Sequence, residues 1–221
     1  MTRARIAAIC AAIAVLGLAS TAGADCLCAD CDNSSTRPFE ITGGNMKPAV
    51  EPGACLTVDT TMPPKRGDIV IFLNPKNGKT AISARLIGLP GDVVQMQDGQ
   101  VILNGAPLPQ TPAEPYMQVM QLEGPARSKP RCPKMTASGA TCAIPRLTET
   151  LPEGGSYDIL DLDPRGKSDT TKAVTMPADQ VFVLGDNRDN SNDSRLDLLA
   201  GGLGLIPAST ILGPVVKITN P

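Results

Sequence analysis

A polar loop near the C-terminal end of the chain holds the densest group of side chains that could do chemistry. It follows the apolar run 181–184 and reads Gly-Asp-Asn-Arg-Asp-Asn-Ser-Asn-Asp-Ser-Arg over residues 185–195. Such a loop is costly to order unless its charges pair, and carboxylates pair bidentately with guanidinium groups. The side chains available for such pairing are Asp186, Asp189, Asp193, Arg188 and Arg195. A polar loop fixed at the end of a strand is a common support for a reaction site.

Other segments carry short motifs that accompany this loop. They read Thr-Gly-Gly-Asn-Met-Lys-Pro at 42–48, Arg-Gly-Asp-Ile-Val-Ile-Phe at 66–72, Arg-Leu-Ile-Gly-Leu-Pro-Gly-Asp at 85–92, Val-Ile-Leu-Asn-Gly at 101–105 and Gly-Leu-Ile-Pro at 204–207. Together with the loop they resemble, in the same order, the conserved boxes of the bacterial signal peptidase I family (peptidase S26). The resemblance runs from about residue 38 to 218. It implies the family's fold and a serine endopeptidase that cleaves signal peptides from preproteins with a serine nucleophile and a lysine base.

This chain departs from that family at the reactive positions. Asn45 stands where the resemblance places the nucleophilic serine, Ala84 stands at the position of the general base, and Gly43 replaces a serine that binds the oxyanion. Acyl transfer needs an activated nucleophile with a base in hydrogen-bond reach. An amide nitrogen is a poor nucleophile because its lone pair is delocalised, and a methyl group accepts no proton. We therefore expect a member that has lost the peptidase activity.

No other residue in the sequence is an evident substitute for this pair. The chain has no histidine. Lys79 is expected on the opposite strand face from position 84, and Lys65 is expected in a solvated turn. Ser191 stands where the family has a serine that orients the lysine, and it could act as a nucleophile only beside a base.

Three functions remain open. The favoured hypothesis is a pseudoenzyme that binds extended peptides or preproteins by strand pairing, or that regulates an active signal peptidase. The alternatives are an active preprotein peptidase with a non-standard nucleophile, and a disulfide-stabilised interaction module. Met46 and Ile82 are candidates for the peptide groove, although Met46 could equally be a core residue. For the polar loop we favour a scaffold role, carried by Asp186, Arg188, Asp193 and Arg195, over a catalytic one. No cofactor or metal is expected.

The N-terminus reads as an export signal. Arg3 and Arg5 precede the apolar stretch 6–19, and Ala22-Gly23-Ala24 forms an A-x-A cleavage site, so residues 1–24 are predicted to be removed. Fourteen apolar residues are short for a membrane span. We expect a soluble, periplasmic protein without a membrane anchor; the alternative is an uncleaved N-terminal anchor facing the periplasm. Removal of the signal would change the net charge from −2 to −4, which gives no basis for nucleic-acid binding.

Six cysteines remain after the predicted signal. An even number in an exported chain indicates three disulfides. Cys132 and Cys142 flank Ser138-Gly139 and are expected to pair across a hairpin. The pairing of Cys26, Cys28, Cys31 and Cys55 stays open. A metal site or a redox C-x-x-C in the segment 26–31 is the less favoured interpretation.

The elements that must position these groups are β-strands. Short apolar runs separated by Gly, Pro and Asn turns predict an all-β, mainly antiparallel domain of curled sheets. The expected strands are 55–58, 68–72, 81–87, 93–96, 101–103, 156–160, 181–184 and 215–218, with a hairpin at Asp98-Gly99 and one short helix near 207–211. We predict a Cys-rich segment at 25–37, a core of catalytic type at 38–105 and 176–221, and a smaller inserted β lobe at 106–175.

Overall fold

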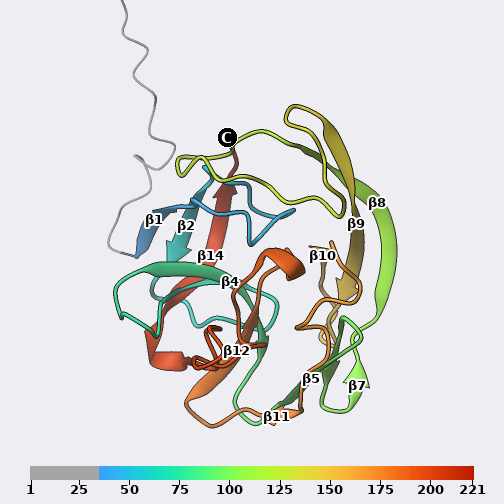
Figure 1. The fold of residues 1–221 in the computed structure, drawn as a ribbon. Helices are drawn as coiled ribbons and strands as arrows, with labels where there is room; N and C mark the ends of the chain where they lie inside the picture. Colours follow the sequence, from blue (N-terminus) through green and yellow to red (C-terminus); the bar gives the residue numbers. More distant parts are fainter. Residues whose placement is uncertain (1–34) are drawn as a thin grey trace, which may run out of the picture.

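The computed structural model describes residues 35–221 of the 221-residue chain. The predicted export signal and the cysteines Cys26, Cys28 and Cys31 lie outside these residues. The described part contains fourteen strands and two short 3-10 turns, and its ladders are antiparallel, arranged in three sheets (Figure 1). The predicted all-β, antiparallel fold class is therefore confirmed.

The largest sheet has seven strands in the order β1-β2-β14-β3-β4-β12-β13. Their bounds are β1 Thr36–Glu40, β2 Cys55–Asp59, β3 Ile69–Leu73, β4 Ala81–Gly88, β12 Gln180–Leu184, β13 Ile206–Pro207 and β14 Ile211–Thr219. The central strand β3 reads Ile-Val-Ile-Phe-Leu, a continuous apolar run that is typical of a strand covered on both faces. Ile69 and Ile71 enter one buried cluster, and Val70 and Phe72 enter another on the opposite face.

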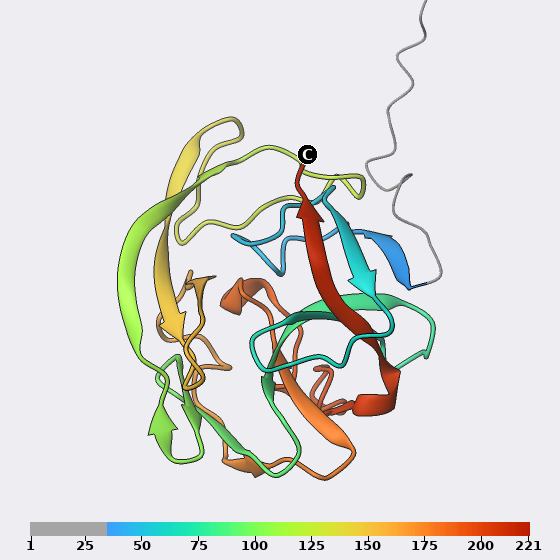
Figure 2. The same ribbon diagram turned by 180° about the vertical axis from the view of Figure 1, so that it is seen from behind.

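Two smaller sheets complete the fold. One has the order β10-β9-β8, with β8 Gln110–Val119, β9 Thr141–Thr150 and β10 Ser156–Leu160. The other has the order β11-β5-β6-β7, with β5 Val93–Gln97, β6 Gln100–Leu103, β7 Ala106–Pro107 and β11 Val174–Thr175. The long strands β8 and β9 form a curved ribbon along one side of the molecule (Figures 1 and 2).

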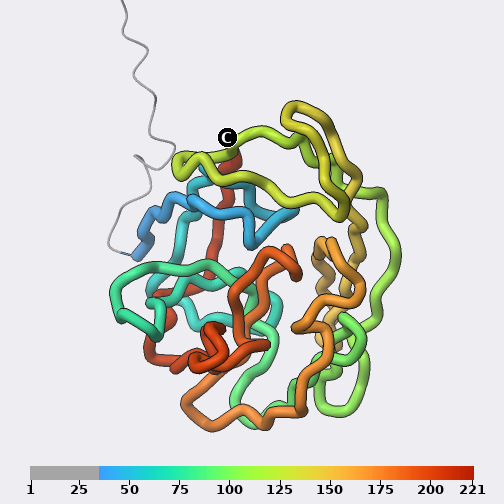
Figure 3. The backbone as a smooth tube through the Cα atoms, viewed as in Figure 1, coloured from blue at the N-terminus to red at the C-terminus, as the bar shows by residue number. Residues whose placement is uncertain are grey.

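A shared apolar core joins the small sheets to the large one. One buried cluster contains Ile87 of β4, Val94 of β5, Val101 of β6, Ile159 of β10 and Phe182 of β12. The tube view shows the chain leaving the large sheet after β4, running through the small sheets, and returning at β12 (Figure 3). As a result, β4 and β12, which are far apart in sequence, become neighbours beneath the polar loop.

The eight predicted strands are all present, and the hairpin at Asp98-Gly99 joins β5 to β6. Both turn residues have positive φ, 49° and 81°, which is the requirement of the tight hairpin turn. The helix expected near 207–211 is a single 3-10 turn, Ala208–Thr210. The sequence did not indicate β8 and β9, because prolines interrupt both runs. Pro112 and Pro115 are accommodated because β8 is an edge strand with a register shift between Ala113 and Tyr116.

The predicted disulfide between Cys132 and Cys142 is present, with 6.2 Å between the two Cα atoms. It ties the loop that follows β8 to the first residues of β9. Cys55 is also disulfide-bonded. Within residues 35–221, no helix has the length and apolar character needed to cross a membrane.

Candidate functional site

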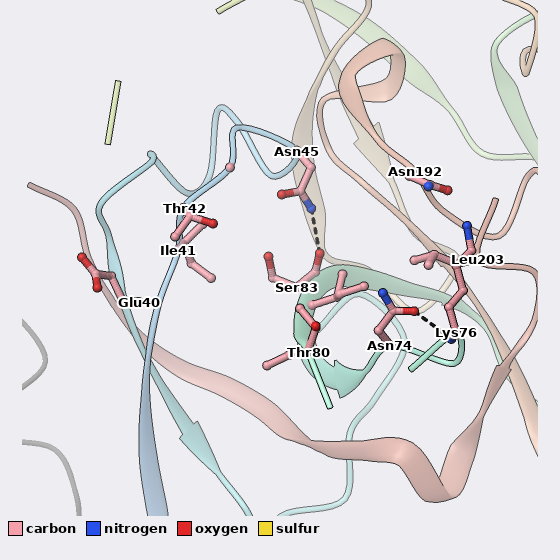
Figure 4. A pocket seen from close by; sticks show the side chains of 13 residues that line it. Glu40, Ile41, Thr42, Asn45, Asn74, Lys76, Thr80, Ser83, Asn192 and Leu203 are labelled. Atoms are coloured by element: carbon pink, nitrogen blue, oxygen red, sulfur yellow. Dashed lines mark hydrogen bonds between the residues drawn. The ribbon is translucent and has the colours of Figure 1, made fainter. Parts of the chain in front are cut away.

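A cavity of about 350 Å³ separates the segment 41–45 from the first residues of β4. Figure 4 shows Asn45 and Thr42 on one side, Ser83 and Thr80 facing them, and Asn192 and Leu203 of the C-terminal region beside them. The complete lining is Glu40, Ile41, Thr42, Gly43, Asn45, Asn74, Lys76, Thr80, Ala81, Ile82, Ser83, Asn192 and Leu203. The sequence-predicted positions Gly43, Asn45 and Ile82 therefore meet at one cavity.

One edge of β4 is unpaired beside this cavity. Residues 81–83 pair with β3 through Leu73↔Ala81, Phe72↔Ile82 and Ile71↔Ser83. On the other edge, pairing with β12 begins only at Leu184↔Arg85. No strand within residues 35–221 pairs with that edge of Ala81–Ser83. The Ser83 carbonyl already accepts from the Asn45 side chain, so an extended chain placed in the cavity could form a ladder with the remaining backbone groups of these residues.

Asn45 is held between β4 and the polar loop. Its side-chain Nδ2 donates to the carbonyl oxygen of Ser83 at 2.8 Å. Its own carbonyl oxygen accepts from the Ser191 hydroxyl at 3.1 Å and from the Asn187 backbone N–H at 3.0 Å. Asn187 also donates from its side chain to the Gly44 carbonyl at 2.9 Å. The polar loop thus holds Gly44 and Asn45 in place through their backbone carbonyl groups.

Ala84 lies next to this arrangement but does not line the cavity. It is 3% exposed and packs in an apolar cluster with Leu203, which does reach the cavity. The register places it one residue beyond the last β4–β12 pair, beside Gly185. A β-carbon added to Gly185 would lie 1.6 Å from the Ser191 Oγ and 2.8 Å from the Asn45 carbonyl oxygen. Positions 45, 84 and 191 lie near one another, because Asn45 donates to the Ser83 carbonyl that precedes Ala84 and accepts from the Ser191 hydroxyl.

Two lysines near these residues are committed to other partners. Lys76 lines the cavity, and its Nζ donates to the Gly201 carbonyl at 2.7 Å. Lys47 is 2% exposed, and its Nζ contacts Gln118 at 2.8 Å and Glu123 at 2.6 Å. Neither ammonium is hydrogen-bonded to a hydroxyl in the part of the chain that the structure describes. Neither lysine therefore forms a hydroxyl–ammonium pair beside Asn45 in the described residues.

Met46 is a core residue. It is fully buried in a cluster with Ile41, Val50 and Leu56 and does not line the cavity. Of the two interpretations that the sequence left open, the structure favours packing over a place in the groove. Lys47, which directly follows it, was not identified from the sequence. Its only signal was a charged residue within an apolar stretch.

The charges of the polar loop pair mainly outside the loop, which corrects the sequence-based expectation. Only Asp193 and Arg195 pair within it, through two bonds of 2.9 Å. Asp186 accepts from the Arg85 guanidinium at 2.7 and 2.5 Å, and Arg188 donates to Glu149 at 2.6 Å. The reason is burial: Asp186 and Arg188 face β4 and β9, where partners at long sequence separation are available.

Glu149 and Arg188 form the most deeply buried of these pairs. Glu149 is 0% exposed and also accepts from the Tyr157 hydroxyl at 2.5 Å and from Gln110 at 3.0 Å. Burial acts to raise the pKa of Glu149, but the charge and hydrogen bonds of Arg188 outweigh it and hold that pKa below its ordinary value. The pair is ionised in the folded protein and ties the polar loop to β9.

Substitution of Gly185 by alanine tests the close approach of the loop to Asn45. The added methyl group has no space beside the Ser191 side chain and the Asn45 carbonyl, so we expect a loss of about 1–3 kcal/mol in the free energy of unfolding. Urea denaturation measures this loss. The matched change Gly155→Ala, at a position with nothing within 4 Å, is expected to cost less. Equal losses for the two variants would contradict the packing described here.

The chain is similar to a known protein family and to several of its members. The family described as signal peptidase, peptidase S26, matches residues 18–219. A signal peptidase I from Rickettsia bellii is 36% identical over 141 residues, which cover 61% of this chain and 42% of the relative. A signal peptidase I from Rickettsia typhi is 31% identical over 156 residues, covering 68% of this chain and 50% of the relative. The chain spans about half the length of the relatives that it matches.

A signal peptidase I from Enterococcus faecalis, known from its crystal structure, is also similar to this chain. Its sequence is 26% identical, the match covers 70% of this chain and 98% of that chain, and the TM-score is 0.37.

Proposed function

The chain belongs to the signal peptidase family, peptidase S26, and from this premise we propose that it is an exported member that binds extended peptides without cleaving them. The periplasmic location follows from the predicted signal at 1–24. The proposed ligands are extended segments of exported proteins. We expect these segments to carry small side chains in an Ala-x-Ala pattern, as the resemblance to the family implies. Regulation of an active signal peptidase would use the same groove.

The observation that carries this proposal is the unpaired edge of Ala81–Ser83 beside the cavity. Main-chain hydrogen bonds to such an edge give affinity, and pockets beside it select alternate side chains. Ile41, Ile82 and Leu203 give the cavity an apolar lining, and Gly43 adds no side chain to it. The groove is therefore suited to an extended chain with small residues.

The loss of cleavage is supported by the contacts of Asn45. Its amide nitrogen is engaged with the Ser83 carbonyl and lacks a nucleophilic lone pair. Ala84 provides no proton acceptor, and the nearby lysines Lys47 and Lys76 are bound elsewhere. Catalysis needs both an activated nucleophile and its base, so these residues favour binding over turnover.

A titration with a fluorescent Ala-x-Ala peptide tests the groove. We expect saturable binding that Ile82→Lys weakens at least about tenfold, equivalent to about 1.4 kcal/mol. The matched control is Ile102→Lys on β6, which lies outside the cavity and is expected to bind like the unmodified protein. Absence of saturable binding would contradict the proposal and favour a disulfide-stabilised interaction module.

A further inference from the structure

Three carboxyl groups converge where the loop after β10 meets the polar loop. Asp161 and Asp169 belong to the first loop, and Asp189 belongs to the 3-10 turn Arg188–Asn190. A β-carbon built on Gly166 would lie 2.6 Å from Asp189 Oδ1 and 3.2 Å from both carboxyl oxygens of Asp169. Glycine at 166 therefore leaves room for carboxyl groups from two loops to approach each other.

Two of these carboxyl groups, those of Asp161 and Asp169, each have a buried oxygen without a hydrogen-bond partner among the described residues. Asp169 is 7% exposed, and its Oδ2 has no hydrogen-bond partner among the described residues; the same is true of the buried Oδ1 of Asp161. Asp163, Arg188 and Arg195 act on the cluster by their charges. Arg188 and Arg195 are already paired with Glu149 and Asp193. The exposed Arg131 donates to the backbone carbonyl of Asp189 and not to a carboxyl group. Burying unpaired carboxylates is unfavourable, so the cluster requires another source of neutralisation.

A proton fits this requirement. Asp161 directly precedes Leu162 and Asp163, whose backbone N–H groups both donate to the Oδ2 of Asp189. Two carboxyl groups held in one corner can form a hydrogen bond only when one is protonated. Burial, followed by the negative charges of Asp189 and Asp169, raises the pKa of Asp161 to about 6. No set of three acidic, histidine or cysteine side chains in residues 35–221 is arranged to hold a metal ion.

The cluster is connected to the candidate site through Asp189. The Oδ2 of Asp189 accepts from the backbone N–H groups of Leu162 at 2.8 Å and Asp163 at 2.9 Å. Two residues after Asp189, Ser191 donates to the Asn45 carbonyl. Repulsion between Asp161 and Asp189 would strain the two backbone bonds that dock the 161–171 loop against the polar loop.

We propose that Asp161, Asp169 and Asp189 form a proton-dependent clasp, in which a proton shared between the carboxyl groups holds the 161–171 loop against the polar loop and loss of that proton releases it. The inference is independent of the proposed peptide binding. Because folding raises the pKa of Asp161, its protonation stabilises the fold at acidic pH. That contribution is lost as the pH rises through about 6.

Thermal unfolding of the full chain in a metal-free buffer tests the clasp. At about pH 7.5 we expect Asp161→Asn to have a Tm roughly 2–4 °C above the unmodified protein, because an amide imitates the protonated acid. At about pH 5 the difference is expected to be smaller, and it disappears only below the unfolded pKa of about 3.9. The control Asp179→Asn changes the same charge at an exposed position and is expected to show no such pH-dependent difference. Parallel curves for Asp161→Asn and the unmodified protein would overturn the proposal.

Two further measurements keep the proposal open to refutation. Amide hydrogen exchange at Leu162 and Asp163, corrected for its intrinsic pH dependence, is expected to become faster between acidic and neutral pH in the unmodified protein. The same amides in Asp161→Asn are expected to show no such change. Unchanged protection of both amides would argue against release of the loop.

Millimolar calcium at neutral pH is expected to leave the Tm unchanged. A rise in Tm that disappears in Asp161→Asn would show that a metal, rather than a proton, neutralises the cluster, and would overturn the clasp.

Discussion

Replacement of Asn45 by serine together with Ala84 by lysine is expected to create, or strongly raise, cleavage of an Ala-x-Ala preprotein peptide. We expect a gain of about 10²–10⁴-fold over the unmodified protein, the range that a positioned general base contributes. Turnover of a fluorogenic peptide measures the gain, and mass spectrometry of the products locates the cleaved bond.

The geometry around position 84 is the reason for this expectation. Ala84 lies beside Gly185, and Gly185 is in contact range of both Ser191 and the Asn45 carbonyl. Ala84 directly follows Ser83, whose carbonyl oxygen accepts from the Asn45 side chain, and Ser191 donates to the Asn45 carbonyl. We therefore expect a lysine at position 84 to start within reach of residue 45 and Ser191. Burial lowers the pKa of a lysine and so prepares it to accept a proton.

Single variants provide the control for this experiment. Asn45→Ser alone lacks a base and Ala84→Lys alone lacks a nucleophile, so each is expected to stay at background. Adding Ser191→Ala to the active double variant is expected to reduce turnover. A folded double variant that binds the peptide but does not cleave it would show that the cleft is not otherwise intact. Turnover by the unmodified protein that Ser191→Ala abolishes would instead establish an active peptidase.

The sequence predicted the local features of this fold better than its long-range contacts. Runs such as 69–73 and the Asp98-Gly99 turn are determined by nearby residues, so pattern and turn chemistry identified them. Strands β8 and β9 were missed because prolines are usually poor strand residues, and only the edge position and register shift show how they are accommodated. The strands β7, β11 and β13 have two residues each, which is too few to show the alternation of apolar and polar residues that identifies a strand.

The same limit applies to the candidate site. The resemblance indicated which positions meet at the cleft, and the structure places Asn45, Ser191 and Ala84 near one another. The partners of the loop charges were not predictable. Arg85 and Glu149 are 101 and 39 residues away from Asp186 and Arg188 in sequence, and nothing in their local patterns specifies the pairing. Charge pairing across a fold depends on which faces become buried together.

Removal of the Glu149 carboxylate is expected to destabilise the protein strongly. Glu149→Leu leaves the Arg188 guanidinium buried without its counter-charge, and breaking such a pair costs about 3–5 kcal/mol. For a chain of this size the Tm is expected to fall by about 10 °C. Chemical denaturation at neutral pH measures the free energy, and calorimetry measures the Tm.

The double variant Glu149→Leu with Arg188→Leu separates the loss of a pair from the loss of packing. Removing both charges leaves no uncompensated guanidinium, so most of the stability is expected to return. As a control, Glu153→Ala breaks the pair with Arg66 at a position whose side chain is 57% exposed, and is expected to cost less than about 1 kcal/mol. A double variant as unstable as Glu149→Leu alone would mean that the packing of the residue 149 side chain on β9, and not its charge, stabilises the fold.

The pH dependence of these variants tests the role of the polar loop as a scaffold. Folding lowers the pKa of Glu149, so its stabilising contribution is present above the unfolded value of about 4.3 and is lost as the pH falls through the lower folded value. Glu149→Leu should therefore lose part of the acid sensitivity of the unmodified protein. If Glu149→Leu changed neither the Tm nor the loss of stability at acidic pH, the buried charges of the polar loop would not hold the strands together. The scaffold role of the loop would then be contradicted.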